Sequence, residues 1–142
     1  MTRQEIISDL LDCLGAISPD QGFAIAPARV RRGIHLASEA GEMPALSLYN
    51  QRVETVDSTE ATTERLLILH LWGAVHTQGG DYGDLDRLAA ACVAALGRAD
   101  LNPHWQRTTC GRLELYEGGA GDPLGLFDLE LSVAYEAPLA TL

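Results

Sequence analysis

The fold class is decided by residues 127–135, which read FDLELSVAY. Large apolar side chains alternate there with small or charged ones, and this period of two is typical of a strand with one buried and one solvated face. A glycine-rich stretch at 118–125 precedes it, and residues 112–117 form another candidate strand. We therefore predict a hairpin, with Asp128 and Glu130 on its solvated face.

Earlier in the chain, residues 66–72 are apolar at both parities. Such a run predicts a central strand covered on both faces. Residues 45–56 predict a second strand, joined to the central one by the polar connection 57–62. Residues 23–26 are compatible with a short strand, and most of the surrounding stretch to residue 43 is expected to be irregular or to run over the surface.

Two amphipathic helices flank these strands. Thr2 and Glu5 form a capping-box pattern before apolar residues at helical spacing, which predicts a helix over 3–16. Asp84 is expected to be the N-cap of a second helix, and Gly97 its C′ residue. The element order predicts an α+β fold, a mixed and largely antiparallel sheet with two helices packed on one face, in a single domain over residues 1–142.

Charge excludes several classes of partner. Ten basic residues, all of them arginine, stand against twenty acidic ones, so the formal net charge is −10 and the pI is about 4.6. A protein that wraps nucleic acid or lies on anionic lipid needs a basic surplus instead. Three widely spaced cysteines and a charged N-terminus without a secretory pattern lead us to expect a soluble intracellular protein with reduced thiols.

Residue types that perform catalysis or hold metals do not form a recognised motif. The loop 79–84 fits neither phosphate-binding pattern and is expected to be a turn with an N-cap. Asp81, Asp84 and Asp86 lack the closing Glu of a calcium loop. His70 lies in an apolar run and is expected to be a hydrogen-bonded core residue. We predict no catalytic, cofactor-binding or metal site, and no enzyme.

Arginine is concentrated at one place in the chain. Arg29, Arg31 and Arg32 bring three of the ten positive charges into four positions. One interpretation is a solvated loop. The other is a contact between subunits, because guanidinium groups pair well with carboxylates and the rest of the chain is rich in them.

The elements, taken together, follow an order found in a known family. A first amphipathic helix precedes a Pro-led strand at 43–49, a long strand at 64–71 and a second helix from Asp84. A glycine-preceded alternating strand that ends in Tyr135-Glu136 closes the chain. In this order the sequence resembles the tail terminator proteins of long-tailed bacteriophages, the lambda-type minor tail protein U family. The arginines at 29–32 and the long loop at 118–125 depart from the family's pattern.

The resemblance implies a mechanical function. Such proteins form a ring, a hexamer in that family, on the head-proximal end of the tail tube, end tube polymerisation and provide the surface for head docking. The implied partners are further copies of the chain, the tail tube protein and the head connector or stopper protein, with DNA as passing cargo and no membrane. The implied location is the neck end of the virion tail, assembled in the host cytoplasm. The alternatives are another small neck or tail-completion protein and a small α+β enzyme or ligand-binding domain.

Two groups of residues receive roles in such a ring. Arg29, Arg31 and Arg32 are expected to meet an acidic patch of the neighbouring subunit, around Asp57 and Glu60. The loop with Asp81, Tyr82 and Asp84 is expected on the rim or in the lumen. An acidic lumen would repel DNA phosphates over about one Debye length, ~8–10 Å at physiological salt.

Overall fold

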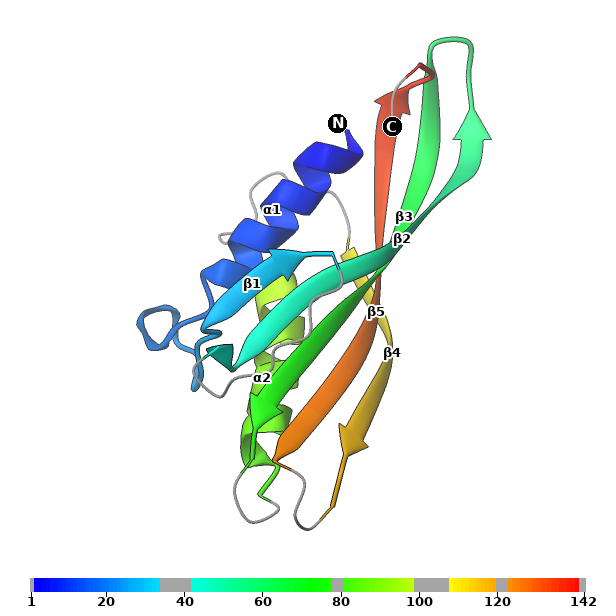
Figure 1. The fold of residues 1–142 in the computed structure, drawn as a ribbon. Helices are drawn as coiled ribbons and strands as arrows, with labels where there is room; N and C mark the ends of the chain where they lie inside the picture. Colours follow the sequence, from blue (N-terminus) through cyan, green and yellow to red (C-terminus); the bar gives the residue numbers. More distant parts are fainter. Residues whose placement is uncertain (1, 34–41, 78–80, 99–107, 120–122, 141–142) are drawn as a thin grey trace.

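The computed structural model describes residues 2–33, 42–77, 81–98, 108–119 and 123–140. Two helices, a short 3₁₀ turn and five strands make up this part of the chain (Figure 1). In chain order they are α1 (Arg3–Gly15), η1 (Pro19–Gln21), β1 (Arg29–Arg32), β2 (Ala45–Ser58), β3 (Thr62–His76), α2 (Gly83–Leu96), β4 (Thr108–Glu117) and β5 (Leu124–Pro138). The predicted α+β fold class is confirmed.

All five strands belong to one mixed sheet with the order β1-β2-β3-β5-β4. β1 is parallel to β2, and every other neighbouring pair is antiparallel. The central position of β3 and the β4–β5 hairpin were both predicted from the sequence and are confirmed. β3 and β5 pair without a register shift from Thr62–Pro138 to His76–Leu124, so they form the spine of the molecule.

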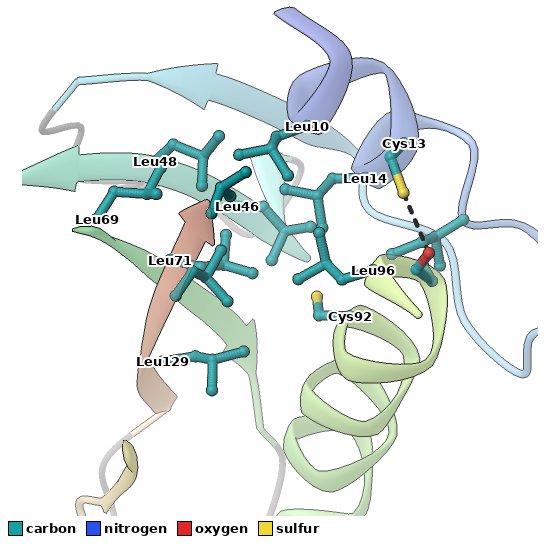
Figure 2. Packing of buried hydrophobic residues seen from close by; sticks show 14 of the residues in the cluster. Leu10, Cys13, Leu14, Leu46, Leu48, Leu69, Leu71, Cys92, Leu96 and Leu129 are labelled. Atoms are coloured by element: carbon teal, nitrogen blue, oxygen red, sulfur yellow. Dashed lines mark hydrogen bonds between the residues drawn. The ribbon is translucent and has the colours of Figure 1, made fainter. Parts of the chain in front are cut away.

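Both helices contribute to one hydrophobic core on the same face of the sheet, which we call the helix face (Figure 2). Alternate residues of the strands point into this core, and most of its large, fully buried side chains are leucines. Fully burying one such side chain stabilises a fold by about 1.5–3 kcal/mol. The labelled part of the core comprises Leu10, Cys13, Leu14, Leu46, Leu48, Leu69, Leu71, Cys92, Leu96 and Leu129.

The opposite side of the sheet, which we call the open face, has no described helix over it. Leu66 and Trp72 of β3 are half-buried there, whereas Leu67 and Leu71 on the helix face are fully buried. Ile68 is buried on the open face as well, so among the described residues the prediction that this strand is covered on both faces is confirmed for the helix face and holds only in part for the open face. Neither helix among the described residues is long and apolar enough to cross a membrane.

Helix ends follow the sequence prediction at α1 and depart from it at α2. Thr2 and Glu5 form the predicted capping box. Tyr82 is the N-cap of α2 and makes no side-chain capping bond, so Asp84 lies in the first turn and its predicted N-cap role is wrong. The helix starts earlier because Asp81 Oδ1 accepts a hydrogen bond from the Gly83 N–H. Gly97 is a right-handed C-cap with φ of −87°, and not the predicted C′ residue.

Strand β1 corrects the prediction for residues 23–43. Residues 23–26 form no strand, and the strand is instead at Arg29–Arg32, in a stretch predicted to be irregular. Its partner is the start of β2, through the parallel register Arg29–Ala45 to Arg32–Leu48. Four residues, three of them arginine, carry no periodic signal of their own, because this strand is set by its pairing with β2.

The hairpin of β2 and β3 extends beyond the helices, and the end of β5 runs beside it (Figure 1). Residues 54–61 are all exposed, and Val56 retains 65% of its accessible surface. We call residues 54–64 the arm. These residues add little to the core, so the arm is a projection from the domain.

Candidate functional site

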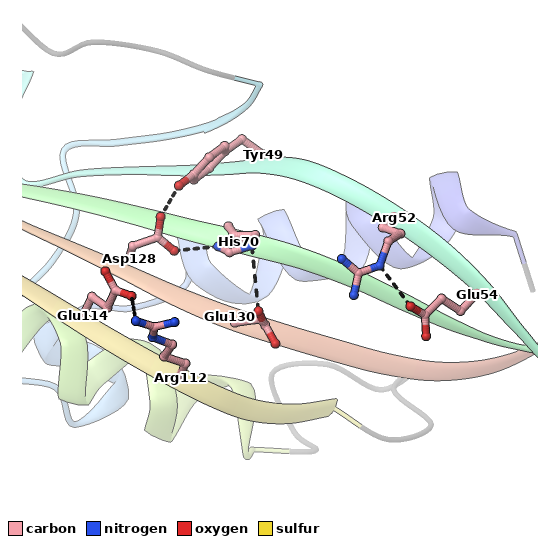
Figure 3. A network of polar contacts seen from close by, with 8 residues as sticks. All are labelled: Tyr49, Arg52, Glu54, His70, Arg112, Glu114, Asp128 and Glu130. Carbon is pink, nitrogen blue, oxygen red and sulfur yellow. Dashed lines mark hydrogen bonds and ion pairs between the residues drawn. The ribbon is translucent and has the colours of Figure 1, made fainter.

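Polar side chains form a cluster on the open face where β2, β3 and β5 run side by side (Figure 3). Tyr49 and Glu130 are the cross-strand neighbours of His70. Asp128 bonds to both His70 and Tyr49: its Oδ1 lies 2.7 Å from His70 Nδ1, and its Oδ2 accepts a hydrogen bond from the Tyr49 hydroxyl. Because a carboxylate only accepts, His70 Nδ1 carries the hydrogen in this contact. We call these four residues the open-face cluster.

A bulge in β2 determines which side chains join this face. The register shifts between Tyr49 and Arg52, where one extra residue enters β2. Asn50 has φ of 55° in the bulge, a left-handed conformation that Asn tolerates better than most residues. The extra residue keeps Val53 opposite Leu67, on the helix face. Without it, the face of every later side chain in β2 would be exchanged.

Burial of the phenol raises the pKa of Tyr49 well above its usual value, and the hydrogen bond to Asp128 adds to the rise. Tyr49 therefore remains a neutral donor up to strongly alkaline pH. Its ring also contacts the His70 ring, with centroids 5.6 Å apart. These contacts hold the imidazole between two strands and leave its Nε2 4.0 Å from Glu130 Oε2.

A shallow hollow of about 120 Å³ lies beside the cluster, lined by His70, Arg112, Glu114, Asp128 and Glu130. Arg112 Nη2 and Glu114 Oε1 form an ion pair of 2.6 Å at its rim. The lining holds three carboxylates and one arginine, and no hydroxyl or thiol nucleophile. Its chemistry therefore suits contact with a polar or cationic surface better than covalent catalysis.

The predicted arginine patch forms strand β1 and divides between the two faces of the sheet. Arg29 and Arg31 pair in register with Ala45 and Ser47 and lie on the open face. Arg32 lies on the helix side, where its Nη1 donates to Gln4 of α1 at 2.8 Å. Arg29 forms a 2.5 Å ion pair with Glu42. The patch is thus an edge strand, and the interpretation as a solvated loop is wrong.

Asp57 and Glu60, the expected partners of these arginines, lie at the tip of the arm. Arg32 pairs with Leu48, and Asp57 is about 30 Å farther along β2 at ~3.3 Å per residue. The two groups therefore do not meet within one chain. Asp57 instead faces Glu64, which faces Glu136 on β5, so three carboxylates form one cross-strand row.

Asp81, Tyr82 and Asp84 lie at the end of the molecule opposite the arm (Figure 1). Tyr82 fastens this end to the β4–β5 connection, because its hydroxyl accepts a hydrogen bond of 2.8 Å from the Gly119 N–H. Asp84 forms a 2.8 Å ion pair with Arg87. Residues 78–80 of the predicted loop lie outside the described residues. A rim or lumen position for this end stays a prediction.

Sequence reasoning missed the open-face cluster as a unit. His70 was expected to be a hydrogen-bonded core histidine; it has the hydrogen bond, but 26% of its side chain is exposed and it points away from the core. The signal was present in the parity of β3 and β5, which places His70 on the same face as Asp128 and Glu130 once the two strands pair. Among the described residues, no group of three His, Cys, Asp or Glu side chains is arranged to hold a metal ion.

Comparison with known proteins adds no relative to these observations. No protein-family model matches the chain, and a search of curated proteins returned no match. The class that the fold itself defines is an α+β protein with a five-stranded mixed sheet, one face of which is covered by two helices.

Proposed function

We propose that this chain is a structural subunit of a phage-tail ring that caps the head-proximal end of the tail tube, ends tube polymerisation and provides the head-docking surface. The observation that carries the proposal is the arm. It exposes Val56, and beyond its own two strands it lies beside the end of β5, through the cross-strand pairs Thr62–Pro138 to Glu64–Glu136 and the bond from the Leu139 N–H to Ala61. A projection that the domain does not need for its core is suited to contact with another molecule.

A ring is supported by the shape of the sheet. Its two outer strands, β1 and β4, differ in length and charge and lie on opposite edges. Contacts between unlike surfaces on opposite sides of a subunit are heterologous, and heterologous contacts generate closed rings when the rotation allows it. A sheet edge that paired with the same edge of a second copy would instead give a two-fold dimer.

The charge is compatible with a conduit for DNA. The net charge of −10 and the row of Asp57, Glu64 and Glu136 would hold phosphates away from the protein surface. Like charges directly opposite one another in a sheet cost stability. The row adds to the negative potential of the arm, which suits repelling DNA or contact with basic groups of a partner.

The test is the length of tails assembled with and without the protein. Electron microscopy of tails from cells that lack it should show overlong tubes, and added purified protein should restore the normal length distribution and appear as a ring at one tube end. Sedimentation of the pure protein and of protein bound to tubes gives the number of copies. Tails of normal length in its absence, together with no ring on tubes, would overturn the proposal.

The contact between Arg29, Arg31, Arg32 and a neighbour's Asp57 and Glu60 stays a prediction within this proposal. The arm tip, which carries Asp57 and Glu60, projects from the domain and is exposed. Its competitor is an acidic surface elsewhere on the neighbour.

A further inference from the structure

Strand β4 has the composition of a pairing surface along its outer edge. β5 is its only neighbour among the described strands. Leu113, Leu115 and Tyr116 retain 41%, 44% and 49% of their surface. An edge strand of ten residues with large side chains so exposed is a template for pairing with another strand.

Strand β1 supplies a partner with the right direction. β1 is parallel to β2, and each of the next three steps across the sheet is antiparallel, so β1 and β4 run in opposite directions. If a second copy is placed by rotation about an axis along the strands, its β1 arrives antiparallel to β4 of the first. The sheet then continues from one copy to the next with the helix faces on the same side.

We propose that β4 of one subunit pairs antiparallel with β1 of the next, so that the sheet continues across the subunit boundary. The inference rests on the proposed ring and names its interface. In the register we infer, Arg31 faces Glu114 on the open face. Val30 faces Leu115 on the helix face, and Arg29 faces Tyr116.

Registers that differ by two residues keep the open face of one subunit beside the open face of the next. Among these registers, charge and hydrophobicity favour the one that we infer. A shift of two residues in one direction would place Arg31 opposite Arg112, which sets two like charges together. The opposite shift would place Val30 opposite Glu117. Only the middle register combines an ion pair, an apolar pair and an arginine–aromatic pair, each a favourable cross-strand combination.

The existing partners of Glu114 allow it to accept Arg31 of the neighbouring subunit. Glu114 already accepts from Arg112 and from the Tyr116 hydroxyl. The Arg112 side chain is 78% exposed, so its ion pair is weak and Glu114 can accept a second guanidinium without a buried charge being left alone.

A charge exchange tests the pairing. Arg31→Glu and Glu114→Arg should each weaken ring formation by roughly tenfold, since each sets like charges together, and the double variant should recover most of the loss. The matched control combines Arg31→Glu with Asp57→Arg at the arm tip and should show no recovery. Ring formation is measured by sedimentation of the protein alone and on tail tubes, and thermal unfolding checks that each monomer folds.

The outcomes separate this interface from the ring itself. Recovery with Asp57→Arg and none with Glu114→Arg would overturn the β1–β4 pairing and leave the ring in place. Single variants that assemble like the natural chain would overturn the pairing as well. A natural chain that forms no ring, alone or on tubes, would overturn the proposed function.

A second measurement does not depend on charge. Arg32 and Leu113 face each other in the inferred register, and facing residues of an antiparallel pair lie within disulfide reach. In a chain that also carries Cys110→Ser, oxidation of the variant with both Arg32→Cys and Leu113→Cys should give a ladder of covalently linked copies, whereas either single variant should give none. An intact ring without this ladder would overturn the inference.

Discussion

At the scale of single residues, Gly73 shows how closely the sheet and core are fitted. Phe127 is its cross-strand partner, fully buried on the helix face. A Cβ on Gly73 would lie 2.1 Å from Phe127 Cε1, so the ring covers the glycine and leaves no room for a methyl group. This absence of a side chain on β3 is what allows the ring of Phe127, the largest core residue, to lie over it.

We therefore expect Gly73→Ala to lower the free energy of unfolding by about 1–3 kcal/mol, because the ring must leave its position in a packed core. Chemical denaturation measures the change. Gly15→Ala is the matched control: its methyl group would meet nothing within 4 Å, and it should leave stability unchanged or raise it by up to ~1 kcal/mol. Equal losses in the two variants would contradict the packing argument.

A second residue-scale prediction concerns alkaline pH. Burial first, and the bond to Asp128 second, raise the pKa of Tyr49 above that of a tyrosine in the unfolded chain. The folded state thus holds the phenol proton more tightly, so this contribution to stability is complete below pH ~10 and is lost as pH rises toward the folded pKa. Tyr49→Phe should make the fall in stability above pH ~10 less steep.

The measurement is the denaturant midpoint of both proteins across the alkaline range. Tyr116→Phe is the comparison variant. Its pKa is also raised, mainly by the hydrogen bond to Glu114, but its phenol is exposed and its removal should change the slope less. Identical slopes for the natural chain and Tyr49→Phe would show that the half-buried phenol of Tyr49 does not couple to folding.

At the scale of elements, the sequence predicted what local periodicity encodes. β5 alternates because one of its faces meets the helices and the other does not, so its strand and its polarity were both visible. β1 was not visible, because four residues owe their strand to β2 and not to their own pattern. The start of α2 was misplaced because a carboxylate at Asp84 suits an N-cap, while Asp81 had already bonded the Gly83 N–H.

The open-face cluster illustrates the same limit for the site. The alternation of side chains along β3 and β5 places His70 and Asp128 on one face. Whether Tyr49 lies beside them depends on the register in which β2 pairs with β3. The register of two long strands is fixed by packing over their whole length, which a local pattern does not contain. The arm was hidden for a related reason, since a polar stretch at 57–62 is typical of both a turn and a projecting hairpin tip.

The arm gives the prediction at this scale. Thr55 and Arg65 are cross-strand partners, so residues 56–64 can be replaced by an Asn-Gly turn that joins them. The side-chain bonds of Thr63 in the excised tip are local: its hydroxyl donates to the Asp57 carbonyl and accepts from the Ser58 hydroxyl. We expect stability to fall by less than about 2 kcal/mol, because few core contacts are lost, while tube capping is lost.

Thermal unfolding and electron microscopy of tails test the two halves separately. A sequence-scrambled tip of the same length, with Val56 and the acids exchanged in position, is the control for bulk. If the shortened chain unfolds at much lower temperature, the arm belongs to the folded core. If it caps tubes normally, the arm is not an assembly contact.

At the scale of the whole molecule, the strands define a long axis with different chemistry at its two ends. The arm, with Asp57 and Glu60, lies at one end, and Asp81, Tyr82 and Asp84 lie at the other (Figure 1). If subunits join edge to edge through β1 and β4, both ends face along the axis of the ring. One rim would then meet the tube and the other the head, and neither would be part of the contact between subunits.

Neutralising the end opposite the arm tests this arrangement. Asp81→Asn keeps the oxygen that accepts from the Gly83 N–H, and Asp84→Asn loses only an exposed ion pair with Arg87 that is worth less than about 1 kcal/mol. The double variant should therefore melt within a few degrees of the natural chain. Because a charged rim steers docking, we expect tails that carry the double variant to be joined to fewer heads, while the length of the tails stays normal. Asp20→Asn in η1 is the control for the loss of a carboxylate elsewhere on the surface. If the double variant joins heads to tails as often as the natural chain does, Asp81 and Asp84 are not part of the docking surface.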